Sequence, residues 1–154
     1  VIGLGAMGAG IAGNLHQAGM LAGAWNRTHA RGQAVASQYG FELAKDLSEA
    51  VQSADLVITS ISADTDLLQI SEQLVERLAA GSIVLDTSTV SSHTAQQVSE
   101  LFAKAGIAFI DGPVSGGREG AEKGTMVMMA GGDSQVLEHI MPVLKVITSK
   151  VQHM

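Results

Sequence analysis

The stretch Val1-Ile2-Gly3-Leu4-Gly5-Ala6-Met7-Gly8 decides the fold, because a short apolar segment runs into a glycine turn and then into a helical pattern. In a G-x-G-x-x-G turn the first glycine permits the tight bend, the second lets a pyrophosphate approach the backbone, and the third lets helix and strand pack closely. A glycine-rich turn that binds nothing is the alternative. We predict a dinucleotide-binding turn whose cofactor contacts are Gly3, Leu4, Gly5, Ala6, Met7 and Gly8.

Strand-like and helical segments alternate along the rest of the chain. Apolar spacing predicts helices over residues 7–18, 30–38, 47–53, 64–79, 91–104 and 135–145, the last broken by Pro142. Strands are predicted at residues 1–4, 21–25, 41–43, 56–58, 82–85, 107–110 and 126–130, and the last residues form a strand or a fraying end. The expected fold is α/β, a Rossmann-like, doubly wound, mostly parallel sheet with helices on both faces, and residues 1–154 form one dinucleotide-binding domain.

Composition narrows the class of protein. The 154 residues are 46% hydrophobic but only 3% aromatic, so aliphatic side chains must build the core. A net charge of -6 has the wrong sign for a nucleic-acid partner. The absence of cysteine excludes disulfides and thiolate metal sites and makes the cytoplasm the expected location. No apolar run approaches the roughly 20 residues that span a bilayer, so no membrane partner is expected. The histidines show no ligand spacing, so no metal is expected.

The end of the predicted second strand indicates which dinucleotide is preferred. NAD enzymes carry an acidic residue there, about 20 residues beyond the glycines, to bind the ribose 2′-hydroxyl. This chain has Asn26-Arg27-Thr28 instead. Guanidinium and hydroxyl groups suit a 2′-phosphate, so we predict NADP in preference to NAD. In the alternative interpretation Arg27 is a solvated loop charge and Asn26 a turn residue.

A second glycine-rich turn, Asp111-Gly112-Pro113-Val114-Ser115-Gly116-Gly117, follows the predicted strand at 107–110. It falls at the carboxyl edge of the sheet, where ligands of doubly wound folds bind. Adjacent glycines and a serine offer several N–H donors and one hydroxyl, a set suited to a carboxylate. A simple turn explains the spacing equally well.

These stretches together resemble the N-terminal domain of the β-hydroxyacid dehydrogenases, the family that includes 3-hydroxyisobutyrate dehydrogenase, tartronate semialdehyde reductase and 6-phosphogluconate dehydrogenase. The resemblance also rests on DTSTVSS at residues 86–92 and on the GGD turn at 131–133, so it covers nearly the whole chain in order. It implies an oxidoreductase that transfers hydride between NADP(H) and a small 3-hydroxy acid or its semialdehyde. Imine reductases share the WNRT-type strand end but lack DGPVSGG as it stands here.

The resemblance also implies roles for individual residues. Ser60 and Ile61 would line the cofactor cleft, Thr89 would lie near the nicotinamide ribose, and Asn26, Arg27 and Thr28 would take the adenosine ribose phosphate. The implied substrate-carboxylate site is Ser115, Gly116 and Gly117.

No catalytic residue is assigned in this chain, because the family's lysine is expected beyond Met154, on a helical second domain that also builds a homo-oligomer. We therefore expect cofactor binding without turnover. Because the segment before Gly3 is shorter than a usual strand, we also expect that the N-terminus is truncated. A non-catalytic NADP-binding module is the alternative from another class, and an imine or a phosphorylated sugar acid is the alternative substrate.

Overall fold

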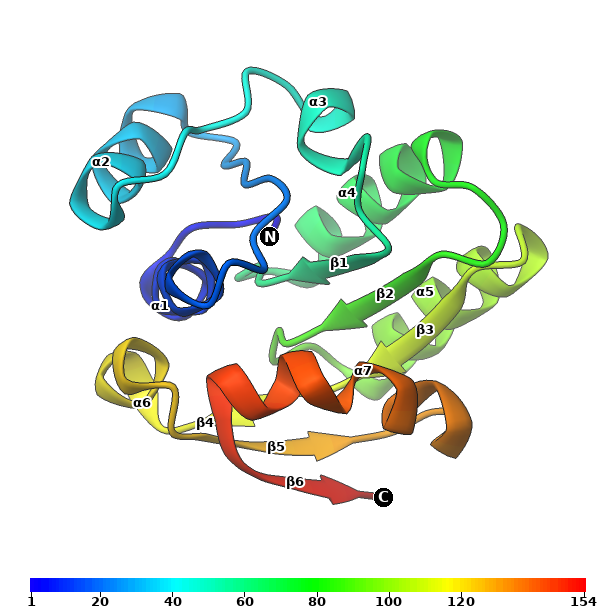
Figure 1. The fold of residues 1–154 in the computed structure, drawn as a ribbon. Helices are drawn as coiled ribbons and strands as arrows, with labels where there is room; N and C mark the ends of the chain where they lie inside the picture. The colour runs from blue at the N-terminus through cyan, green and yellow to red at the C-terminus, as the bar shows by residue number, and fades with distance from the viewer.

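Three parallel strands form the centre of the fold (Figure 1). The computed structural model describes all residues from 1 to 154. The strands pair in this order: β1 (Leu56–Thr59), β2 (Ile83–Asp86) and β3 (Ala108–Asp111). In their register Thr59 lies opposite Asp86, and Asp86 lies opposite Asp111. Three polar residues therefore end neighbouring strands at one edge of the sheet.

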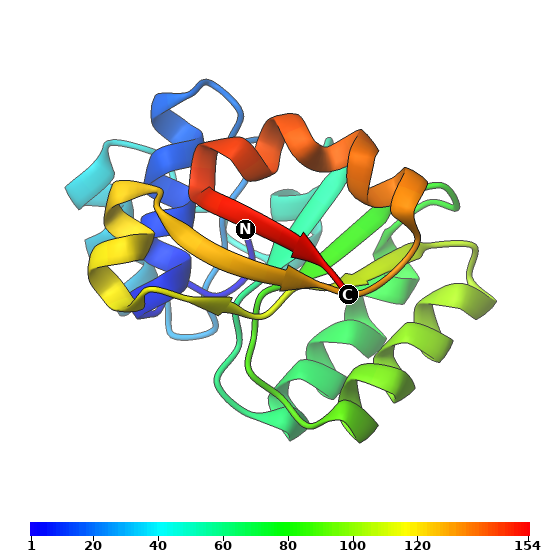
Figure 2. The ribbon, with the colours of Figure 1, turned by 90° about the horizontal axis from the view of Figure 1, so that it is seen from below.

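Helices cover both faces of this sheet. They are α1 (Ala6–Gln17), α2 (His29–Tyr39), α3 (Leu47–Val51), α4 (Asp64–Arg77), α5 (Ser92–Lys104), α6 (Gly117–Lys123) and α7 (Ser134–Ile147). Val57 and Val84 face the core shared with α3, α4 and α5. Ile58 and Leu85, next along the same strands, face the core shared with α1 and α7. Figure 2 shows α4 and α5 on one side of the strands and α7 on the other. The predicted fold class is confirmed.

A second small sheet extends the first one beyond β3. Its strands are β4 (Val114–Ser115), β5 (Met126–Ala130) and β6 (Thr148–His153). Strand β4 is antiparallel to β5, and β5 is parallel to β6. An antiparallel bridge between Asp111 and Gly131 connects the two sheets. The sheet is thus parallel at its centre and mixed at this side. The last residues were predicted as a strand or a fraying end, and they form β6. Neither β4, which lies in the stretch 111–117 interpreted as a turn, nor α6, which begins at the end of that stretch, was predicted.

The expected strands at 1–4, 21–25 and 41–43 are shorter than predicted or absent. Ile2 makes single parallel bridges to Trp25 and to Thr59, and Gly3 leaves the extended conformation at once with a φ of 97°. The prediction for 41–43 is wrong because the Phe41 N–H donates back to the carbonyl of Ala36 in α2. That donor is used to end a helix rather than to pair a strand.

Helix α7 continues through Pro142, although the sequence predicted a break there. Proline removes one N–H donor, yet the side chain lies on the exposed face of the helix. The opposite face carries Leu137, Ile140, Leu144 and Ile147, which are buried against the sheet. Packing of this apolar face therefore keeps the helix continuous despite the lost bond.

Candidate functional site

The glycine turn connects Ile2 to α1, and its glycines meet different surroundings. A Cβ on Gly3 would lie 2.1 Å from the carbonyl oxygen of Ser60, and a Cβ on Gly8 would lie 1.9 Å from that of Gly3. Both glycines are therefore needed for close packing. Gly5 is exposed, begins α1, and would have nothing within 4 Å of a Cβ. The N–H groups of the first helical turn start at this open position, where an anion can accept their hydrogen bonds.

A cleft of about 160 Å³ lies beside this turn. It is bounded by the glycine turn, the segment that follows Trp25, the loop after β1 and the first turns of α4. Its lining residues are Gly3, Gly5, Trp25, Asn26, Arg27, Thr28, Arg31, Ser60, Ile61, Ser62, Asp66 and Ile70. Seven residues of the predicted cofactor set are thus brought together. The five lining residues that the predicted set does not contain are Trp25, Arg31, Ser62, Asp66 and Ile70.

Asn26 connects two walls of the cleft. Its Oδ1 accepts a hydrogen bond from the Leu4 N–H at 2.8 Å, and its Nδ2 donates to the Thr28 carbonyl at 2.9 Å. Both polar ends of the amide are therefore used within the protein. Asn26 shapes the cleft by holding the glycine turn against the Arg27 segment, and each end of its amide keeps one further hydrogen-bonding position.

Arg27 is a solvent-exposed basic residue that lines the cleft. Its side chain is 70% exposed, and Nη1 forms an ion pair with Asp66 Oδ1 at 2.9 Å. Arg31 lines the same cleft from the first turn of α2 and is also exposed. Two arginines thus line one cleft, and guanidinium groups can pair with an anionic group such as phosphate.

A buried carboxylate lies where the central strands end. Asp86 accepts hydrogen bonds from Thr59 Oγ1 at 2.7 Å and from Ser88 Oγ at 2.6 Å, while its Oδ2 is buried without a partner. Burial raises the pKa of Asp86, and the two hydroxyls oppose that rise. Ser88 Oγ in turn accepts from the Ile61 N–H at 2.7 Å. This network ties the loop after β1 to the loop after β2.

The other predicted residues lie outside this cleft. Leu4 and Gly8 are buried beneath the turn, Met7 packs against the core, and Ala6 lines a neighbouring pocket. Thr89 is exposed in the loop between β2 and α5. Ser115 ends β4. None of these residues lines the cleft.

The predicted substrate-carboxylate site at residues 115–117, called here the carboxylate turn, leads into α6 rather than forming a plain loop. Gly116 and Gly117 have φ values of 132° and 63°, which favour glycine. Asn14 of α1 fixes this helix, since its Nδ2 lies 2.8 Å from the Ala121 carbonyl and 3.1 Å from that of Glu122. Residues of both helix starts line one pocket, Gly5 from α1 and Arg118 from α6. The carboxylate turn is thereby held near the glycine turn.

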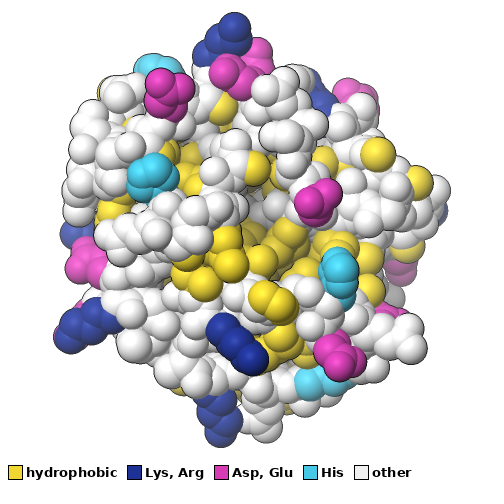
Figure 3. All heavy atoms as spheres, viewed as in Figure 1, with side chains coloured by type: hydrophobic (Ala, Val, Ile, Leu, Met, Phe, Trp, Pro, Cys, Tyr) yellow, Lys and Arg dark blue, Asp and Glu magenta, His cyan; other side chains and the backbone are white.

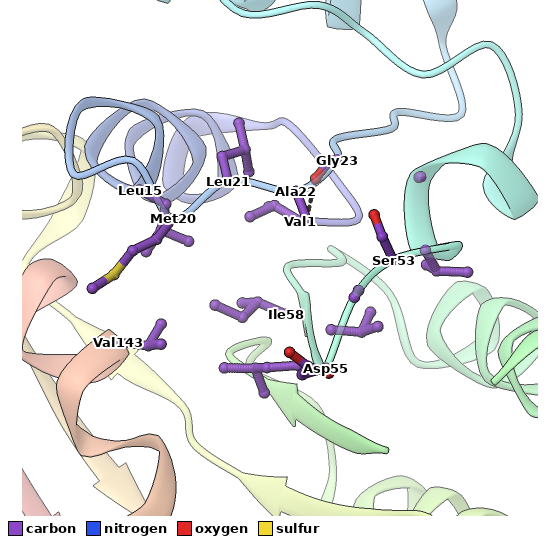
Figure 4. Close-up of a pocket in the computed structure, with 15 residues that line it drawn as sticks. Val1, Leu15, Met20, Leu21, Ala22, Gly23, Ser53, Asp55, Ile58 and Val143 are labelled. Carbon is purple, nitrogen blue, oxygen red and sulfur yellow. Dashed lines mark hydrogen bonds between the residues drawn. The ribbon is translucent and has the colours of Figure 1, made fainter. Parts of the chain in front are cut away.

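An apolar hollow occupies another part of the molecule. Figure 3 shows hydrophobic side chains gathered in it, and Figure 4 shows Leu15, Leu21, Ile58 and Val143 among its lining residues. Its volume is about 290 Å³. The hollow includes Asp55 and Leu56 at the amino end of β1, whereas the glycine turn and Ser60 lie at the carboxyl end. It is therefore separate from the cleft.

No group of three or more His, Asp or Glu side chains is placed to hold a metal ion. No helix combines the length and the apolar composition that crossing a bilayer requires. Lys123, the lysine nearest the carboxylate turn, pairs with Glu119 at 2.6 Å on the exposed face of α6.

Fold and site together define a dinucleotide-binding α/β domain. A glycine turn leads into α1, and a cleft with two arginines lies at the carboxyl ends of parallel strands. The family model described as the NAD binding domain of 6-phosphogluconate dehydrogenase matches residues 1–154. The chain belongs to this family.

Its relatives are oxidoreductases about twice as long. The NAD-dependent L-serine dehydrogenase of Pseudomonas aeruginosa is 33% identical over 99% of this chain and 52% of its own length. The solved structure of Mycobacterium tuberculosis 3-hydroxyisobutyrate dehydrogenase with L-serine is 31% identical, has a TM-score of 0.94 and is matched over 99% of this chain and 52% of that chain. Psf3 in complex with NADP+ and 2-OPP is 28% identical, with a TM-score of 0.88 and coverage of 99% and 54%. The chain thus spans about half the length of these relatives.

Proposed function

We propose that this chain binds NADP(H) in the cleft beside the glycine turn, with residues 1–154 as the cofactor domain of a longer enzyme. The placement of Arg27 and Arg31 in the lining of one cleft carries the proposal, since a 2′-phosphate is the group that distinguishes NADP from NAD. Family membership supports a dinucleotide in this position. Gly5 leaves room for the pyrophosphate beside free helix N–H groups.

For the whole protein we propose hydride transfer between NADP(H) and a small 3-hydroxy acid or its semialdehyde. The names of two similar proteins, an L-serine dehydrogenase and a 3-hydroxyisobutyrate dehydrogenase, refer to small acids that carry a hydroxyl on the third carbon. The cofactor supplies the redox chemistry when it is bound. Ser115, Gly116 and Gly117 would bind the substrate carboxylate through the serine hydroxyl and backbone N–H groups.

The network around Asp86 supports the arrangement of the nicotinamide end. It holds Ile61, on the loop after β1, to Ser88, next to Thr89 on the loop after β2. In our proposal these two loops flank the nicotinamide ribose. The proton donor is proposed to come from the helical half outside residues 1–154, so this chain binds cofactor without catalysing turnover.

Calorimetric titration with NADPH and, separately, with NADH tests the proposal. We expect NADPH to bind more tightly, and Arg27→Ala to weaken NADPH by about 10- to 100-fold, because a charge-assisted bond to phosphate contributes roughly 1.5–3 kcal/mol. NADH affinity should change little. Lys104→Ala, which removes an exposed charge from the last turn of α5, is the matched control.

Equal affinities for the two cofactors in the unchanged chain would contradict the NADP preference while leaving the fold untouched. Binding of neither cofactor would overturn the proposed cofactor site itself. A non-catalytic module would also bind NADPH, and the full-length protein distinguishes it, since a module would show no oxidation of 3-hydroxy acids with NADP.

A further inference from the structure

One carboxylate lies among the residues that line the cofactor cleft. Asp66 is the only acidic residue in that lining, whereas the basic residues are Arg27 and Arg31. The side chain of Asp66 is 26% exposed, and its Oδ1 lies 2.9 Å from Arg27 Nη1. The arginine proposed to bind the 2′-phosphate therefore already has an anionic partner inside the protein.

Asp66 and Asp64 lie on the same helix but have different hydrogen-bond partners. Asp64, two residues earlier in the first turn of α4, accepts hydrogen bonds from Ser91 Oγ and Thr94 Oγ1, both at 2.7 Å. That carboxylate joins α4 to the start of α5 and is structural. Asp66 makes no such contact, and its one ion pair reaches across the cleft to Arg27.

We propose that Asp66 is a specificity-determining residue, which competes with the 2′-phosphate of NADP for the Arg27 guanidinium and thereby limits the preference for NADP over NAD. This inference rests on the proposed function. Like charges repel, so a phosphate that binds Arg27 next to Asp66 must either displace the carboxylate or remain close to it. NADH carries no 2′-phosphate and does not have this cost.

The ion pair also explains why Arg27 alone is an incomplete guide to cofactor preference. The guanidinium is planar with several donors, and Asp66 occupies Nη1 on one of its edges. Only the remaining donors are free for phosphate unless the pair opens. Both partners are partly exposed, so opening is inexpensive and NADP still binds, but with lower affinity than Arg27 and Arg31 would otherwise allow.

The test is calorimetric titration of Asp66→Asn with NADPH and with NADH. Asparagine keeps the size of the side chain and removes its charge. We expect the Kd for NADPH to fall by about three- to tenfold and the Kd for NADH to change by less than about twofold, with the gain shrinking as KCl is raised. Glu72→Gln, at an exposed position on α4 outside the cleft, is the matched control and should leave both constants unchanged.

A second variant pair tests the competition directly. In an Arg27→Ala background, Asp66→Asn should lower the Kd for NADPH by a smaller factor than in the unchanged chain. Only direct repulsion between Asp66 and the phosphate remains once the guanidinium that the two anions share is gone. An unchanged or higher Kd for NADPH in Asp66→Asn alone, or a full gain that persists without Arg27, would overturn the inference. Failure of the unchanged chain to bind either cofactor would instead contradict the proposed function on which the inference about Asp66 rests.

Discussion

Gly5 and Gly8 belong to the same turn, yet of these two positions the packing of the protein requires a glycine only at position 8. A methyl group on Gly8 would collide with the backbone carbonyl of Gly3, whereas one on Gly5 would meet nothing within 4 Å. Gly8 is therefore a requirement of folding. No contact within the protein requires a glycine at position 5, and in our proposal the pyrophosphate of the cofactor occupies the space beside it.

This difference predicts opposite outcomes for two alanine substitutions. Gly8→Ala should lower the free energy of unfolding by about 1–3 kcal/mol, because the backbone must shift to admit the methyl group. Gly5→Ala should stay within about 0.5 kcal/mol of the unchanged chain but bind NADPH more weakly. Urea denaturation and calorimetry measure the two effects. Undiminished NADPH affinity in Gly5→Ala would contradict the assignment of the phosphate site.

Asp86 predicts how stability depends on pH. Burial holds its pKa above the ordinary value of 3.8, so the native state binds this proton more tightly than the unfolded state. Its contribution to stability is therefore full below pH 3.8 and is lost as pH rises through the raised pKa. We compare the unfolding free energy of the unchanged chain with that of Asp86→Asn. The first minus the second should fall as pH rises from 3.8 through the raised pKa of Asp86, and should stay constant at higher pH.

Chemical denaturation at a series of pH values from about 3.5 to 8 measures that difference. The exposed Glu72→Gln serves as the control for loss of one carboxylate. A difference that rises with pH would mean that the hydroxyls of Thr59 and Ser88 outweigh burial, contrary to the stated direction.

At the level of elements, the packing of α1 against α6 joins the two glycine-rich segments of the chain. A Cβ on Gly10 would lie 2.5 Å from the backbone of Ala121, so the helices are in close contact. Asn14 adds polar contacts from its Nδ2 to the Ala121 and Glu122 carbonyls at the end of α6. The carboxylate turn therefore depends on a residue more than one hundred positions earlier in the sequence.

Asn14→Ala should cost about 1–2 kcal/mol of unfolding free energy, because the carbonyl of the buried Ala121 loses its partner. It should also loosen α6 more than the rest of the fold. Hydrogen exchange of residues 117–123 should become faster, as measured by mass spectrometry. Gln17→Ala, at an exposed position in the last turn of the same helix, is the control. Unchanged exchange in α6 would contradict this role for Asn14.

At the scale of the whole molecule, the local sequence pattern predicted the strands of the central sheet but not all elements of the second sheet. The central strands β1, β2 and β3 are short apolar runs between helices, and periodicity predicted each within a residue or two. The segment at 111–117 carries three glycines and a serine, so it was interpreted as a turn, and no element was predicted at 118–123. In the structure β5 supplies the strand with which β4 pairs, and α1 supplies the surface on which α6 packs.

The sequence by itself determined the alternation of strands and helices, the glycine turn at the start of α1 and the absence of an acidic residue beside Arg27 in the chain. These are local properties, set by side-chain periodicity and by the backbone freedom of glycine. Only the tertiary structure decided that Asp66 meets Arg27, that Asp86 joins two loops and that α6 rests on Asn14. Such contacts join residues 27 to 107 positions apart, and no local pattern encodes them because packing, not propensity, brings the partners together.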